Sequence, residues 1–164
     1  MDLYVLRHGK AEGTANGRRD ADRALTGKGR AEIKALAGWL ADQEISFDVI
    51  ASSPLTRAKE TADIIAKMLG LESRMALWES LGPGGDPATV LRDADTSRED
   101  SSVLIVGHEP ALSLLVSRII AGSDDAAVVM AKGSLAKIRN YSFAARPSGE
   151  LQWLVTPGLV TVGQ

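Results

Sequence analysis

Cysteine is absent from this 164-residue sequence, which excludes disulfides, thiolate zinc sites and a cysteine nucleophile. Long apolar runs are absent too. None approaches the roughly 20 residues that a membrane span needs, so we expect no membrane insertion. The N-terminus passes from Met1 and Asp2 straight into a strand-like run, without a basic leader or a cleavage site. This start predicts a cytoplasmic protein.

A strong charge of either sign is also lacking. The formal net charge is −2, so we expect no nucleic-acid or anionic-membrane partner. Any anion site must therefore be a local cluster of positive charge. With 45% apolar and 24% charged residues, the composition is that of a globular protein, and the length suits a single domain over residues 1–164.

Short apolar runs alternate with amphipathic stretches along the chain, as in α/β proteins. Central strands are expected at residues 3–6, 47–54 and 101–107. Helices are expected at 26–43 with Thr26 as its cap, from Pro54 to Gly70, from Pro87 to about residue 94, and from Pro110 to near Gly122. A short edge strand is expected within 73–87, and a hairpin from strands at 134–143 and 151–157 with a turn at 146–150. We therefore predict a three-layer αβα sandwich with a mostly parallel central sheet and an antiparallel C-terminal hairpin.

The three central strands each end in groups that can bind or transfer an anion. The first ends in Arg7 and His8, the second in Ser52 and Ser53, and the third in His108, while Arg57 follows the second strand on its helix. In open α/β sheets, ligands bind beyond the carboxyl ends of the strands. If these strands are parallel neighbours, all of these groups meet in one site.

The two arginines carry most of the information about an anion. Arg57 lies in the first turns of its predicted helix, where the helix dipole favours anions, so an anion held between Arg57 and the helix start would explain it. The alternative is a surface arginine. Arg7 closes an apolar run, and arginine is seldom buried unpaired. The alternative for Arg7 is a structural ion pair with Asp48 or Asp63.

Other uses of the two histidines have less support. A metal site would need more ligands than two histidines without an H-E-x-x-H spacing or clustered carboxylates can supply, so no metal is expected. Neither of the glycine-rich nucleotide-binding motifs is present, and no cofactor is expected. A receiver-type phosphoacceptor domain would need acidic residues where Arg7 and His8 stand. A phosphate pocket of two arginines and two histidines remains.

Such a pocket suits transfer of a phosphoryl group through histidine. Each guanidinium group can donate two parallel hydrogen bonds to phosphoryl oxygens. Nearby cations lower the pKa of an imidazole, which keeps it neutral and able to attack phosphorus. The product would be a phosphohistidine, which water then hydrolyses. A proton donor for the leaving group is also needed. Glu79 is the first candidate, and Asp86 is the second, although its place before Pro87 suits a helix cap.

The segments LRHGKAE, SSPLTRAKETA and IVGHEP, in this order and spacing, resemble the histidine phosphatase (phosphoglycerate mutase-like) superfamily. The resemblance implies that His8 is the phosphorylated nucleophile and that Arg7, Arg57 and His108 bind the phosphoryl group. It also matches Glu79 to the proton donor. Within the superfamily, DRALTGKG most resembles the SixA-type phosphohistidine phosphatases, although Ala24 replaces a proline of their pattern and Lys10 and Ala11 replace the Glu-Thr or Glu-Ser of other members.

The length of the chain favours a phosphatase over a mutase. Only residues 76–86 separate the edge strand from the next helix, which leaves little material for the closing loops that a mutase needs to exclude water. We predict a metal-independent phosphatase that acts on phosphohistidine in a protein. The alternatives are a phosphatase of a small phosphomonoester and a non-catalytic phosphate-binding regulator.

The partner would be a phosphotransfer protein that bears a phosphohistidine. Lys10 and Arg23, together with Arg18 and Arg19, are expected to meet acidic residues around that histidine. The alternative is that these are solvated loop charges.

Overall fold

The computed structural model describes residues 1–161, and its central layer is one six-stranded sheet in the order β3-β2-β4-β1-β5-β6. The strands are β1 (Asp2–Arg7), β2 (Val49–Ser52), β3 (Met75–Leu77), β4 (Ser102–Gly107), β5 (Leu135–Phe143) and β6 (Pro147–Val155). β1, β4, β2 and β3 run parallel, whereas β5 is antiparallel to β1 and to β6. The predicted mostly parallel sheet with an antiparallel C-terminal pair is confirmed.

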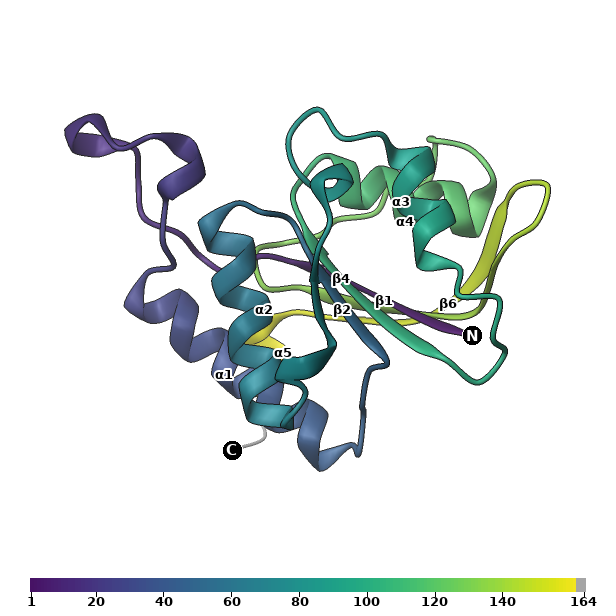
Figure 1. Ribbon diagram of the computed structural model, residues 1–164, viewed down its shortest axis with the longest axis horizontal. Coiled ribbons are helices and arrows are strands. Elements are labelled where there is room, and N and C mark those ends of the chain that lie inside the picture. Colours follow the sequence, from purple (N-terminus) through teal and green to yellow (C-terminus); the bar gives the residue numbers. More distant parts are fainter. Residues whose placement is uncertain (162–164) are drawn as a thin grey trace.

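Helices cover both faces of this sheet (Figure 1). One face carries α1 (Gly27–Asp42), α2 (Thr56–Leu69) and α5 (Pro157–Thr161), and the other carries α3 (Pro87–Ala94) and α4 (Ala111–Ala121). Successive residues of a strand point to opposite faces. Tyr4 and Leu6 of β1 therefore pack toward α1 and α2, while Leu3 and Val5 pack toward α3 and α4. Within residues 1–161, no helix is long and apolar enough to cross a membrane.

The helix ends follow the signals in the sequence. The hydroxyl of Thr26 accepts a hydrogen bond from the backbone N–H of Gly29 at 2.9 Å, so it caps α1 as predicted. Gly70 and Gly122 end α2 and α4 with φ of 67° and 70°, a conformation that costs glycine little. Asp86 caps α3.

Three element boundaries differ from the prediction. α2 begins at Thr56 and α4 at Ala111, so Pro54 and Pro110 precede their helices instead of opening them. β6 begins at Pro147, and most of the expected turn at 146–150 is strand. Gly149 signals close packing there, since a Cβ at Gly149 would lie 2.6 Å from the side chain of Ile138.

Candidate active site

The ends of β1, β2 and β4 lie side by side at one edge of the sheet. Arg7 pairs with Gly107 across β1 and β4, and Ser52 pairs with Val106 across β2 and β4. The ladder continues for one residue, because the His8 N–H donates to the Gly107 carbonyl at 3.1 Å. As a result, the ring centroids of His8 and His108 lie 5.1 Å apart. The strand ends that the sequence predicted to meet do meet.

The tautomer of His8 is set by its own neighbour. Its Nδ1 lies 2.7 Å from the carbonyl oxygen of Gly9, which can only accept, so Nδ1 carries the proton and Nε2 carries a lone pair. The Nε–H of Arg57 points at that lone pair from 3.4 Å. Burial lowers the pKa of His8 to about 3, and the charges of His108, Arg57 and Arg7 act in the same direction. His8 is therefore a buried, neutral imidazole with one free nitrogen.

Gly9 and Thr61 hold the loop after β1 against α2. A Cβ at Gly9 would lie 2.9 Å from the side chain of Ile33, so only glycine allows α1 to pack this close. The Gly9 N–H donates to the Thr61 hydroxyl at 3.1 Å, and that hydroxyl donates to the Arg57 carbonyl at 2.8 Å. Thr61 thus joins the backbone beside His8 to the backbone of Arg57. Sequence reasoning assigned no role to Thr61 and missed this link.

Arg57 is buried, with 7% of its surface exposed, so the surface alternative is wrong. It is the second residue of α2, and both of its terminal nitrogens donate to Asp20. Nη1 donates to the Asp20 carbonyl at 2.8 Å and Nη2 to the Asp20 carboxylate at 3.1 Å. The other carboxylate oxygen accepts from Arg23 at 3.0 Å. The sequence predicted an anion at Arg57, and within the protein that anion is a carboxylate.

Asp20 lies in the short helix η2 (Asp20–Asp22), inside the basic loop that the sequence predicted to contact a partner, but the sequence assigned no role to Asp20 itself. The hydrogen bond from Arg23 and the charge of Arg57 hold the pKa of Asp20 below its usual value, so the carboxylate is ionised. A phosphoryl group that binds the two terminal nitrogens of Arg57 has to displace this carboxylate. The only sequence signal was its spacing of three residues from Arg23.

We expect Asp20→Asn to bind inorganic phosphate about tenfold more tightly, a change of about 1.4 kcal/mol, because phosphate no longer competes with an internal anion. Isothermal titration calorimetry at low ionic strength measures this. Asp22→Asn is the matched control, because it removes the same charge from the same short helix. The native Asp22 carboxylate pairs with the exposed Arg19 at 2.7 Å and not with Arg57. Equal or weaker phosphate binding by Asp20→Asn than by Asp22→Asn would contradict the competition.

Arg7 has no ion pair with Asp48 or Asp63 among the described residues, so that alternative is wrong. Its Nη1 donates to the Met130 carbonyl at 2.9 Å, and its buried Nε has no hydrogen-bond partner within residues 1–161. Asp48 instead lies 3.7 Å from Arg74 and caps the start of β4. A buried donor without a partner is costly, and an anion in the pocket would satisfy it.

His108 is held by Ser53. Its Nε2 lies within hydrogen-bond distance of the Ser53 hydroxyl oxygen, at 2.8 Å, and the Leu55 N–H donates to the same oxygen at 3.3 Å. The Nδ1 of His108 is buried and has no partner among residues 1–161. Burial lowers the pKa of His108 to about 4, and the charge of Arg57 adds to this, whereas Asp20 opposes it. Both imidazoles of the pocket are thus neutral at pH 7.

This pair predicts an acid-tolerant enzyme. A histidine with a lowered pKa stays neutral until the pH falls to that value, so protonation of His8 and His108 does not begin near pH 6.5. The pH dependence of kcat/KM reports the pKa values of groups in the free enzyme. We therefore expect the fall in kcat/KM that is caused by protonation of these histidines to occur below pH 5. A pH profile corrected for the ionisation of the substrate phosphate measures it. An enzyme-derived limb centred near pH 6.5 would show that the imidazoles titrate normally.

Two further predicted residues, Lys10 and Arg23, belong to the segment between β1 and α1. Lys10 is exposed, and its carbonyl accepts from the N–H and the hydroxyl of Thr26. Arg23 reaches the pocket through Asp20, and its Nε donates to the Glu12 carbonyl.

The two candidate proton donors, Asp86 and Glu79, lie in different local structures. Asp86 caps α3, and its hydrogen bonds from Thr89 and Ala88 lower its pKa, which makes it a poor proton donor. Glu79 begins the short helix η4 (Glu79–Leu81), which follows β3 at the carboxyl edge of the sheet, and its side chain is exposed.

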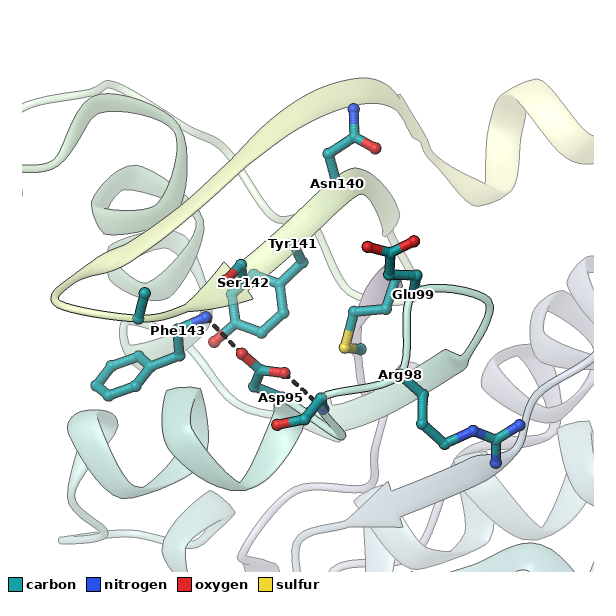
Figure 2. A pocket seen from close by; sticks show the side chains of 10 residues that line it. Asp95, Arg98, Glu99, Asn140, Tyr141, Ser142 and Phe143 are labelled. Carbon is teal, nitrogen blue, oxygen red and sulfur yellow. Dashed lines mark hydrogen bonds between the residues drawn. The ribbon is translucent and has the colours of Figure 1, made fainter.

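A second hollow, of about 730 Å³, lies away from this pocket, beside Met1 and the end of β5 (Figure 2). Its central carboxylate is occupied, since Asp95 accepts from the backbone N–H groups of Phe143 and Ser97. The hollow therefore offers no free anionic group from Asp95.

Comparison with known proteins identifies the family. A model of the histidine phosphatase superfamily (branch 1) matches residues 3–81. The phosphohistidine phosphatase SixA of Escherichia coli (strain K12) is 31% identical over 124 residues, which cover 74% of this chain and 76% of that protein. The chain belongs to the histidine phosphatase superfamily. A phosphohistidine phosphatase SixA homolog of Haemophilus influenzae is 33% identical over 129 residues, which cover 73% of this chain and 77% of that one. The protein is therefore a phosphohydrolase.

The fold of this histidine phosphatase is that of SixA. A structure of the protein histidine phosphatase SixA complexed with tungstate superimposes with a TM-score of 0.84 at 25% identity, and the match covers 98% of this chain and 99% of that one. The predicted phosphoglycerate mutase-like architecture is therefore confirmed over nearly the whole chain.

Proposed function

We propose that the protein removes the phosphoryl group from phosphohistidine in a partner protein, with His8 as the nucleophile. The observation that carries this proposal is the hydrogen bond of His8 Nδ1 to Gly9, which leaves Nε2 unprotonated beside Arg57. The nearby cations supply the positive charge that a phosphoryl group requires. The names of the SixA relatives support phosphohistidine as the substrate class.

The reaction takes two displacements at phosphorus. The phosphoryl group replaces Asp20 on Arg57, and Arg7 and His108 bind its other oxygens. His8 Nε2 then attacks phosphorus while the bond between phosphorus and the substrate imidazole breaks, and that imidazole leaves with a proton. Water next attacks the phosphohistidine at His8, inorganic phosphate departs, and His8 returns to its neutral form. Neutral His8 is already prepared for the next cycle.

We assign the proton for the leaving group to Glu79. General acid catalysis contributes roughly 10²–10⁴-fold where a basic leaving group must be protonated. We expect Glu79→Gln to slow alkyl phosphates by about that factor and activated aryl phosphates by far less. Steady-state kinetics on both classes measures the difference, with Asp86→Asn as the control that removes a capping carboxylate. Equal losses on both classes would mean that Glu79 positions the loop instead of donating a proton.

The segment between β1 and α1 projects from the body of the molecule and offers a contact surface for the partner (Figure 1). Its basic residues are less available than their number suggests. Arg19 pairs with Asp22 at 2.7 Å, and Arg23 pairs with Asp20 at 3.0 Å. Lys10 and Arg18 are exposed. We propose that Lys10 contacts the partner directly and that Arg23 does so when Asp20 is displaced.

The test is a comparison of kcat/KM between a phosphohistidine phosphotransfer protein and a panel of metabolite phosphates. We expect the protein to be preferred, and we expect the preference to weaken with salt as surface charges are screened. A metabolite turned over at about 10⁴ M⁻¹s⁻¹ or faster, with slow turnover of the protein, would favour the small-phosphomonoester alternative. No turnover of any substrate would favour a phosphate-binding regulator.

A further inference from the structure

An apolar cavity of about 370 Å³ adjoins the phosphate pocket, and Arg57 and His108 both form part of its wall. This volume lies within the range of small-molecule sites, roughly 300–1,000 Å³. Most of the remaining wall is apolar and comes from three elements: the loop at 80–85, α3 and α4. The apolar side chains that line it include Leu81, Pro83, Val90, Pro110 and Leu115.

The apolar wall is a fixed part of the fold. Leu81, Val90 and Leu115 are buried and belong to the core cluster beneath α3 and α4. The loop closes tightly on itself, because a Cβ at Gly85 would lie 2.0 Å from the Ser80 carbonyl oxygen. Gly84 has a φ of 76°. The loop that seemed too short to form a lid therefore builds one wall of a preformed cavity.

We infer that this cavity binds an apolar side chain that flanks the phosphohistidine of the substrate protein. The inference rests on the proposed function, because it takes Arg57 and His108 as the groups that hold the phosphoryl. Substrate atoms attached to a phosphoryl group held there lie beside the cavity whose wall these two residues form. An apolar side chain that enters the cavity removes its own apolar surface and that of the cavity wall from water, which favours binding. A sugar or glycerate would instead lose its water hydrogen bonds without replacement.

The experiment uses the native chain and a series of N-phosphoryl n-alkylamines from ethyl to hexyl, with unsubstituted phosphoramidate as the reference. These substrates keep the phosphorus–nitrogen bond, and the basicity of the amine is nearly constant along the series. We expect kcat/KM to rise by about fourfold for each methylene that enters the cavity. The ratio of hexyl to ethyl substrate is the readout, because it cancels any general change in activity.

Ala111→Phe tests the location. Ala111 is exposed, lies at the start of α4 and lines the cavity, so phenylalanine there is expected to bring the hexyl-to-ethyl ratio close to one. Ala121→Phe makes the same change at the other end of α4, at an exposed residue outside the cavity wall, and is expected to keep the wild-type ratio. Thermal unfolding of both variants checks that they fold.

The outcomes separate the two proposals. A flat wild-type series with active turnover of phosphoramidate overturns the cavity inference and leaves the proposed function standing. A steep series that survives in Ala111→Phe also overturns it, since the alkyl chain then binds elsewhere. If the wild type turns over neither these substrates nor a phosphohistidine phosphotransfer protein, the proposed function fails, and the inference fails with it. If Ala111→Phe does not fold, the smaller change Ala111→Leu at the same position replaces it, and the hexyl-to-ethyl ratio is expected to fall below that of the wild type.

Discussion

Replacing His8 with alanine is expected to abolish the phosphoenzyme and to lower turnover by roughly 10⁴–10⁶-fold, as removal of a nucleophile does. The reason is geometric: Nε2 of His8 carries the free lone pair, and Arg57 faces it from 3.4 Å. Brief reaction with ³²P-labelled substrate, followed by denaturation, measures the covalent phosphate. A phosphohistidine should be labile in acid and stable in base, unlike a phosphoserine.

His108→Ala is the control for this experiment. It removes the second imidazole, 5.1 Å away, and leaves the His8–Gly9 hydrogen bond in place. We expect slower labelling in His108→Ala, with the label still on a histidine. Label that persists in His8→Ala would assign the nucleophile to another residue. Ser53, which contacts His108 at 2.8 Å, would then be the next residue to test.

Replacing Arg57 with alanine is expected to lower kcat/KM by roughly 10²–10³-fold, the loss typical of removing a preorganised donor to a reacting oxyanion. The guanidinium has two tasks. Its terminal nitrogens bind an anion, which is Asp20 in the free protein, and its Nε faces the nucleophile. Arg57→Lys should recover little of the activity, because an ammonium keeps the charge but not the planar fork that serves both tasks.

Arg30→Ala is the matched control for Arg57→Ala. Arg30 also forms a short ion pair, 2.6 Å from Glu60, but it is partly exposed and lies outside the pocket. We expect its activity to match that of the wild type. Steady-state kinetics with separate kcat and KM values, supported by thermal unfolding, measures all three variants. Arg57→Ala within tenfold of the wild type, or full activity in Arg57→Lys, would show that the fork geometry is dispensable.

The sequence alone determined the layered α/β fold and the meeting of Arg7, His8 and His108. Both depend on local patterns. Apolar runs of strand length specify buried parallel strands, and the carboxyl ends of neighbouring parallel strands share one edge. The caps at Thr26 and Gly70 are local in the same sense, because a cap bonds only to its own helix. The registers of β1, β2 and β4 then bring the strand ends together.

Only the tertiary structure decided what these residues contact. Asp20 reaches Arg57 across 37 positions and Thr61 reaches Gly9 across 52, and no periodicity encodes contacts between side chains so far apart in the chain. The apolar cavity has the same origin, since its wall combines the loop at 80–85 with α3 and α4, each of which has an ordinary sequence pattern by itself. Pairings of this kind depend on how loops pack against helices, and that packing exists only once the sheet has formed.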